Sequence, residues 1–135
     1  MSYFCETVRS PLTRKRLFVF ACLAFVLSVC VPTHAMAAQR QSDLLALANV
    51  FGELHHLRRM CEPARETDLW RERMKQLVSL EQPTSTLRRQ MVGQFNTGYR
   101  NAQGRYLSCT DLAKEYAAIR AGDGRALSSR LAGRY

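Results

Sequence analysis

The chain has 135 residues and a formal net charge of +9, set by 20 basic and 11 acidic side chains. It contains no low-complexity segment, no repeat and no internal linker, which excludes a repeat protein and a chain of several domains.

The first 37 residues have the three parts of a secretory signal peptide. Residues 1–16 are basic, and residues 17–31 form an unbroken apolar run, LFVFACLAFVLSVCV. This run is short for a membrane-spanning helix, which needs about 20 apolar residues. Ala35 and Ala37 then supply the A-x-A pattern of a cleavage site. We therefore expect a signal peptide over residues 1–37, and a periplasmic mature chain over residues 38–135 with no membrane span.

Two other interpretations of the leader stay open. The tetrapeptide LSVC at residues 27–30 resembles a lipoprotein cleavage box, which would make Cys30 a lipidation site. Val29, however, is larger than the residue usual at that point. The apolar run could also remain attached to the protein as an uncleaved anchor.

Export changes the number of cysteines that have to be explained. Cys5, Cys22 and Cys30 leave with the leader, so Cys61 and Cys109 are the only two in the mature chain. The leader also takes four of the 20 basic residues and one of the 11 acidic ones, which leaves 16 against 10, a net charge of +6. In an oxidising compartment two remaining thiols become a disulfide.

The first helix of the mature chain is expected over residues 42–61. Ser42 is a plausible N-cap, and the carboxylate of Asp43 suits the first turn. Apolar residues recur at helical steps of three and four: Leu44, Leu47, Phe51, Leu54, Leu57 and Cys61. The pair Glu62-Pro63 ends the helix, because a residue before proline avoids helical backbone angles.

Two more helices are expected before residue 105. One restarts at Thr67-Asp68 and closes at Pro83, with an apolar stripe at Trp70, Met74, Leu77 and Val78. The next is capped by Thr84 or Ser85 and breaks around Gly104. Its apolar side consists of Leu87, Met91, Val92, Phe95 and Tyr99.

The fourth helix is expected to begin near Ser108, where Ser108 and Asp111 resemble a capping pattern. Its apolar stripe is predicted at Leu112, Tyr116 and Ile119. Glycines within residues 122–124 are expected to interrupt it, and a last helical turn or two resumes through Leu127 and Leu131. No segment shows the sustained alternation of a strand, so no sheet is predicted.

Four helices with short connections predict an all-α fold, a small up-down four-helix bundle that forms one domain over residues 38–135. In that topology the end of the first helix and the start of the fourth lie at the same pole. Cys61 and Cys109 lie at those two points, so the topology brings the thiols together. The disulfide would close a loop of about 49 residues, which is worth roughly 4 kcal/mol in the chain-entropy treatment.

The segment LHHLRRMCEP suggests a metal site, but its spacing argues against one. On a helix His56 and Cys61 point about 140° apart, and His55 and Cys61 about 240° apart, whereas zinc needs four ligands at one point. A catalytic cysteine is also excluded, since the disulfide removes the thiolate. We predict no metal, no cofactor and no catalytic residue, and an enzyme is not favoured.

The most distinctive polar stretch is FNTGYRNAQGRY at residues 95–106. Gly93 and Gly98 lie inside a helical pattern, and glycine there often allows close approach of another segment. Hydrogen-bonding and stacking side chains gather near the disulfide pole as a candidate binding surface for an anionic or carbonyl-rich partner: Arg58, Arg59, Asn96, Tyr99, Arg100, Arg105 and Tyr106. A purely structural network, with Tyr99 packed and the arginines solvated, stays open.

A basic chain is a candidate for nucleic-acid binding. Export argues against it, and the arginines are dispersed along the chain. The expected partner is an envelope protein or an anionic envelope component, such as phospholipid head groups, lipopolysaccharide phosphates or cell-wall carboxylates.

Four motifs in this order, GELHHLRRMC, LWRERM with the lone Trp70, FNTGYR and YLSCT, resemble a family of small exported alphaproteobacterial proteins without an assigned function. The resemblance covers residues 47–135. It implies a helical protein of the periplasm or envelope and carries no catalytic residue, and His56 departs from it where an aromatic residue is expected.

The expected function is therefore a structural or partner-binding role in the cell envelope, without a defined activity. One alternative is a small enzyme or enzyme accessory that acts on cell-wall material, and another is a lipid-facing factor that would bind anionic liposomes in a salt-dependent way. The enzyme would need a cleft with carboxylates of shifted pKa, for which Glu53 or Glu62 near Arg100 are the candidates.

Overall fold

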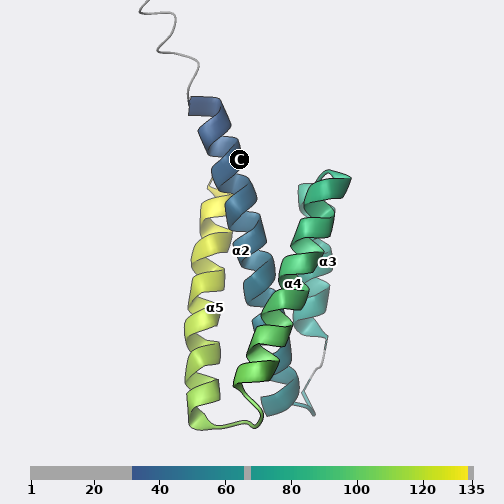
Figure 1. Cartoon of the computed structure of the whole chain (residues 1–135). Helices are drawn as coiled ribbons and strands as arrows, with labels where there is room; N and C mark the ends of the chain where they lie inside the picture. Colours follow the sequence, from purple (N-terminus) through teal and green to yellow (C-terminus); the bar gives the residue numbers. More distant parts are fainter. Residues whose placement is uncertain (1–31, 66–67, 134–135) are drawn as a thin grey trace, which may run out of the picture. The chain divides into compact units, whose positions relative to one another are not determined.

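A computed structural model describes residues 32–65 and 68–133. These residues form four helices and no strand: α2 (Pro32–Cys61), α3 (Leu69–Glu81), α4 (Ser85–Arg105) and α5 (Asp111–Ala132). Successive helices run in opposite directions, and α2 lies between α5 and the pair α3 and α4 (Figure 1). The predicted all-α up-down arrangement of four helices is confirmed.

The chain divides into two compact units, residues 1–37 and residues 38–135. Most of the predicted signal peptide, with Cys5, Cys22 and Cys30, lies outside the described residues. Whether the segment is cleaved after Ala37 stays a prediction.

Helix α2 begins ten residues earlier than predicted, at Pro32 rather than Ser42. The segment before Ser42, AMAAQRQ, is rich in alanine, glutamine and arginine, which favour a helix, so no cap is needed at that point. The carboxylate of Asp43 is buried and accepts hydrogen bonds from Gln39 (3.1 Å) and Arg130 (3.3 Å). The predicted end of the helix at Cys61, before Glu62-Pro63, is confirmed.

The predicted turn between α3 and α4 is also confirmed. Gln82 takes a left-handed backbone conformation with φ of 43° and ends α3 directly before Pro83. The hydroxyl oxygen of Thr84 then accepts a hydrogen bond from the backbone N–H of Leu87 at 3.3 Å, and thus caps α4.

Helix α5 differs from the prediction in two respects. Its N-cap is Thr110, whose hydroxyl oxygen accepts a hydrogen bond from the backbone N–H of Ala113 at 3.2 Å, rather than Ser108. The helix also continues without a break through residues 122–124. Gly124 is buried against Val50 and Leu47 of α2, and this packing offsets the helix-weakening effect of glycine.

The predicted apolar stripe of α5 was wrong as well. Leu112 and Ile119 are 66% and 57% exposed, and only Tyr116 of that stripe is half-buried. The buried side of the helix consists of Ala113, Gly124, Leu127 and Leu131. Small residues let α5 approach α2 closely, so burial here follows helix contact rather than side-chain size.

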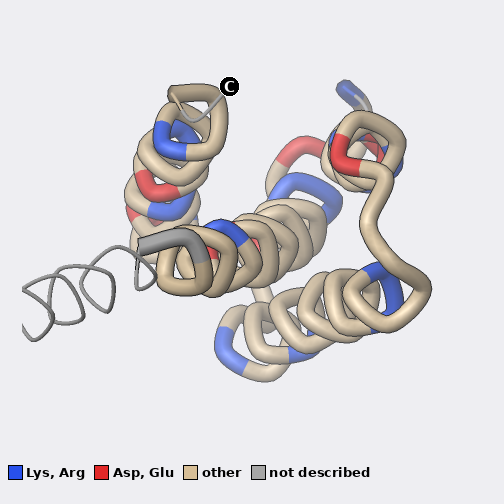
Figure 2. Tube along the Cα trace, turned by 90° about the horizontal axis from the view of Figure 1, so that it is seen from above, with Lys and Arg blue, Asp and Glu red and all other residues tan. Residues whose placement is uncertain are grey.

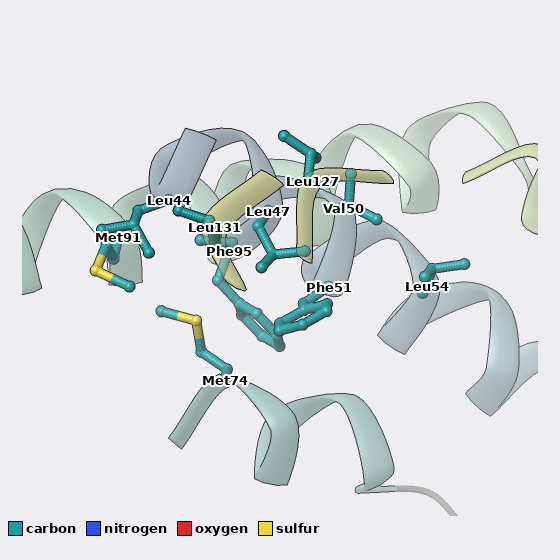
Figure 3. Packing of buried hydrophobic residues seen from close by; sticks show 11 residues of the cluster. Leu44, Leu47, Val50, Phe51, Leu54, Met74, Met91, Phe95, Leu127 and Leu131 are labelled. Carbon is teal, nitrogen blue, oxygen red and sulfur yellow. The ribbon is translucent and has the colours of Figure 1, made fainter. Parts of the chain in front are cut away.

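The main core is built on α2, which contributes side chains to contacts with all three other helices (Figure 3). Its buried members are Leu44, Leu47, Ala48, Val50, Phe51, Leu54, Met74, Met91, Phe95, Leu127 and Leu131. A second cluster of Leu57, Ala102, Tyr106 and Ala113 lies at the end of α2. There Cys61 and Cys109 form a disulfide with a Cα–Cα distance of 5.1 Å, so the predicted disulfide is confirmed.

Candidate functional site

The structure places the seven predicted binding residues in different settings. Tyr106 is buried, and its ring lies 5.2 Å from that of Tyr116. Tyr99 is half-buried, with its ring 5.7 Å from the ring of His55 and 5.3 Å from that of His56. These two tyrosines therefore contribute to packing.

The five polar candidates differ in exposure and in their contacts. Asn96 and Arg100 are exposed on α4, and Arg100 donates a hydrogen bond to Thr97 at 3.3 Å. The guanidinium of Arg105 lies 5.5 Å from the centre of the Tyr116 ring, a cation–π contact. Arg59 is exposed, whereas Arg58 pairs with Glu62 at 3.7 Å. Binding by these side chains stays a prediction.

The two neighbouring histidines of α2, His55 and His56, both have structural contacts. His55 is buried, with its ring 5.7 Å from that of Phe95. His56 is half-buried, and its Nε2 lies 3.1 Å from the backbone oxygen of Tyr106. Within residues 32–65 and 68–133, no group of three His, Cys, Asp or Glu side chains is placed to hold a metal ion.

A partly buried ionic network connects α2 with α5. The Arg120 guanidinium donates one hydrogen bond to the buried carboxylate of Glu53 and another to Asp123 at 2.6 Å. Burial lowers the pKa of Arg120, but the hydrogen bond and the charge of Glu53 outweigh it and raise that pKa above its ordinary value. Burial and the neighbouring Glu53 carboxylate raise the pKa of the Tyr116 phenol above its ordinary value of 10.0.

Sequence reasoning missed this network. It placed Glu53 near Arg100 on α4, whereas the partner is Arg120 on α5. The i, i+3 spacing of Arg120 and Asp123 indicates an ion pair along one helix. Glu53 of α2 reaches this pair only because α5 packs against α2.

The principal hollow of the described surface is a groove between α3 and α5, which we call the α3–α5 groove. Its floor is apolar and comes from α2, with Leu47, Phe51, Leu54 and Leu57. It has three sections with volumes of about 260, 470 and 500 Å³, and adjoining sections share lining residues. The volumes of the two larger sections fall in the range of small-molecule sites, about 300–1,000 Å³.

The walls of the α3–α5 groove differ in character. The α3 wall has Trp70, which packs 5.6 Å from the ring of Phe51, and further along Leu77 and Leu80. The α5 wall has mainly small side chains, Ala117, Ala118, Ala121, Gly124 and Ser128, together with the longer Lys114, Arg125 and Leu131.

Two arginines face the middle section of this groove from opposite walls, Arg73 on α3 and Arg125 on α5. In the part of the chain that the structure describes, neither is paired with a carboxylate. Arg73 donates a hydrogen bond only to the neutral Gln76 at 3.3 Å. By contrast, Arg40 at the end of the groove binds Glu81 through two hydrogen bonds of 2.7 and 2.8 Å.

Helix α4 adds positive charge without acidic residues. It contains Arg88, Arg89, Arg100 and Arg105 and no Asp or Glu, so its trace in Figure 2 carries blue segments and no red. A surface of one sign attracts ligands of the opposite sign over several ångströms.

Comparison with protein families gives one match. The profile of a family described as "Protein of unknown function (DUF2385)" matches residues 30–135. The chain belongs to this family. The resemblance inferred from the four sequence motifs, to an uncharacterised family, is thereby confirmed. No curated protein and no solved structure matches the chain.

Membership of DUF2385 supplies no activity, so the function has to be inferred from the site. Among the described helices of this DUF2385 protein, none combines the length and apolar character that crossing a membrane requires. Arg58 is the only one of the seven predicted residues that lines the α3–α5 groove, in its section beside Cys61. Of the other lining residues, the sequence analysis singled out Trp70, the disulfide cysteine Cys61 and the candidate carboxylate Glu62.

Proposed function

We propose that this DUF2385 protein is an exported binding protein of the cell envelope, and that it takes an anionic partner in the α3–α5 groove. The role is binding rather than catalysis. The proposal has two parts, the compartment and the site.

The compartment is supported by the leader and by the disulfide. Residues 1–37 have the basic, apolar and A-x-A parts of a secretory signal. The bond between Cys61 and Cys109 would be reduced in most cytosols but persists in an oxidising space.

The observation that carries the binding role is the placement of Arg73 and Arg125 over an apolar floor. A guanidinium without a carboxylate partner beside an apolar groove offers both charge and hydrophobic contact to a ligand. In paired arginines, such as Arg120 with Glu53, the positive charge is already neutralised by a carboxylate.

The alternative, a small enzyme or enzyme accessory acting on cell-wall material, finds less support. Its candidate carboxylates are both ion-paired: Glu53 is buried with Arg120, and Glu62 lies 3.7 Å from Arg58. A general acid or base must reach a substrate proton. Neither carboxylate is paired with Arg100, whose hydrogen bond goes to Thr97.

The test is a pull-down from envelope fractions with the full chain tagged at its C-terminus, compared with two variants. Ser128→Phe fills the groove where two sections meet, and Gln103→Phe adds the same ring on the exposed side of α4. We expect an anionic component to be enriched with wild type and Gln103→Phe and lost with Ser128→Phe. N-terminal sequencing of the same preparation should begin at Ala38. Equal enrichment by all three proteins, or none, would contradict the proposed site.

A further inference from the structure

We infer that the α3–α5 groove binds one acyl chain of a phosphate-bearing membrane lipid, with its phosphate between Arg73 and Arg125. This inference rests on the proposed function and deepens it, because it names the class of ligand. The argument depends on the length of the groove, the character of its floor, and the position of its unpaired cations.

The groove has the length and the lining of an acyl-chain site. Beyond Arg73, helix α3 continues for eight residues to Glu81, which at about 1.5 Å per residue gives this part of the wall a length of about 12 Å. The hydrocarbon core of a bilayer is about 30 Å thick and two acyl chains deep, so one chain spans about 15 Å and most of it fits along this wall. The section next to Arg73 is lined by Leu47, Phe51, Leu77, Leu80 and Leu131, and suits the chain itself.

The floor is already buried within the protein, since Leu47, Phe51 and Leu54 are between 2% and 9% exposed, so the open apolar surface of the groove lies on its α3 wall. Leu80 at the end of this section is 79% exposed. The small side chains of α5 opposite, Ser128 and Gly124, do not reach across. A bound acyl chain would bury Leu80 and the exposed part of the α3 wall, at about 25 cal/mol for each Å² of apolar surface removed from water.

The charges at the middle of the groove select an anionic head group. Arg73 lines both the middle section and the section proposed for the acyl chain. Arg125 lines the middle section from the opposite wall, on α5. Two guanidinium forks from opposite walls can share the several oxygens of one phosphate, whereas a carboxylate is satisfied by one fork. The acidic residues that line the groove pair with other arginines and not with Arg73 or Arg125: Glu81 binds Arg40, and Glu62 pairs with Arg58.

A protein helix fits this groove less well than a lipid. A three-turn helix is about 10 Å wide and 16 Å long and so fills on the order of 1,200 Å³. Such a helix would have to occupy all three sections at once, and it would cover Arg73 and Arg125 without offering them a phosphate. The basic leader of residues 1–16 is also a poor occupant, because Arg73 and Arg125 would repel it.

Trp70 makes the inference testable, because it is the only tryptophan of the chain and lines the middle section, where the phosphate is placed. Its ring centre lies 5.6 Å from that of Phe51, which also lines the section proposed for the acyl chain, so the bromine atoms are placed on the acyl carbons nearest the head group. Bromine atoms on an acyl chain quench tryptophan fluorescence only at close range. The probe is lysophosphatidic acid with a brominated acyl chain, held below the concentration at which it forms micelles. The protein is purified after expression of the full chain.

We expect saturable quenching by this probe. The double variant Arg73→Gln with Arg125→Gln should bind it at least about tenfold more weakly, since charge-assisted hydrogen bonds to phosphate are lost. Ser128→Phe should abolish the quenching. The charge-matched control, Arg71→Gln with Arg88→Gln, alters exposed residues outside the groove and should bind like wild type.

Brominated monoacylglycerol, which has no charge, and a brominated fatty acid separate the two parts of the inference. If the uncharged probe quenches as strongly as lysophosphatidic acid, the proposed role of Arg73 and Arg125 is wrong. If the fatty acid binds more tightly than lysophosphatidic acid, the preference for a phosphate head group is wrong. Absence of quenching by any probe would overturn the lipid assignment. If the pull-down then still recovers another anionic component through the groove, the proposed function stands and only the ligand class is wrong; if it recovers none, both fail.

Discussion

Gly98 of α4 lies directly against the carbonyl group of Asn49 on α2. One turn along the same contact, Gly52 of α2 lies against the carbonyl group of Phe95. A β-carbon at either glycine would overlap the backbone of the opposite helix. The two helices thus approach backbone to backbone, and α2 can contact α3 and α5 with its remaining faces.

This contact predicts a large loss of stability for Gly98→Ala. The added methyl group would push α4 away from α2, and we expect the free energy of unfolding to fall by about 3 kcal/mol or more. Gly93 provides the control, because a β-carbon there would meet nothing within 4 Å. Gly93→Ala should raise the free energy of unfolding by up to about 1 kcal/mol. Urea unfolding measures both, and similar midpoints for the two variants would refute the contact.

Much of the fold could be predicted from the sequence where local signals and packing agree. The spacing of Leu47, Phe51 and Leu54 marks the buried face of α2, and Pro63 and Thr84 mark a helix end and a helix start. Gly98 was expected to allow a close approach and does so. Gly93 carries the same sequence signal but lies on an exposed face, and only the orientation of α4 separates the two.

The disulfide should contribute a large part of the stability. Cys61 and Cys109 are 48 residues apart, and closure of a loop of this length is worth roughly 4 kcal/mol. We expect the variant with both cysteines replaced by alanine to lose about that amount, measured by urea unfolding. Addition of a reductant should shift the wild-type midpoint and leave the double variant unchanged. An insensitive wild type would contradict this role.

The pair of Glu53 and Arg120 should be strongly coupled. Removal of one partner leaves a charge in a partly buried site, so Glu53→Ala is expected to lower the free energy of unfolding by about 3 kcal/mol. Asp123→Ala tests the outer contact of the same guanidinium, and at an exposed carboxylate it should cost less than about 1 kcal/mol. A double-mutant cycle with Arg120→Ala measures the coupling. Additive losses in that cycle would show that the two residues act independently.

The phenol of Tyr116 should ionise only above pH 10.0, the ordinary pKa of tyrosine. Burial and the carboxylate of Glu53 raise its pKa above 10.0 in the folded protein, whereas the unfolded chain keeps the ordinary value. The resulting stabilisation is complete below pH 10 and is lost as pH rises through the folded pKa. The difference in phenolate absorbance between wild type and Tyr116→Phe should have its midpoint above pH 10.0. A midpoint at or below that value would refute the effect of Glu53.

The candidate site was harder to predict than the fold. A groove arises where side chains are too small to fill a gap, and the sequence of α5 hides this because its large apolar residues, Leu112 and Ile119, face outward. Arg73 and Arg125 look like ordinary exposed cations in sequence. Their position opposite each other depends on how α3 and α5 both pack on α2.

The central claim, an anionic partner in the α3–α5 groove of an exported protein, is tested most directly by photo-crosslinking in intact cells. A photoreactive phenylalanine derivative replaces Ser128 inside the groove or Gln103 on α4, and the adducts are identified after fractionation. We predict a phosphate-bearing lipid adduct from position 128, in the periplasmic or membrane fraction, and none from position 103. Identical adducts from both positions, or a protein found only in the cytosol, would contradict the account.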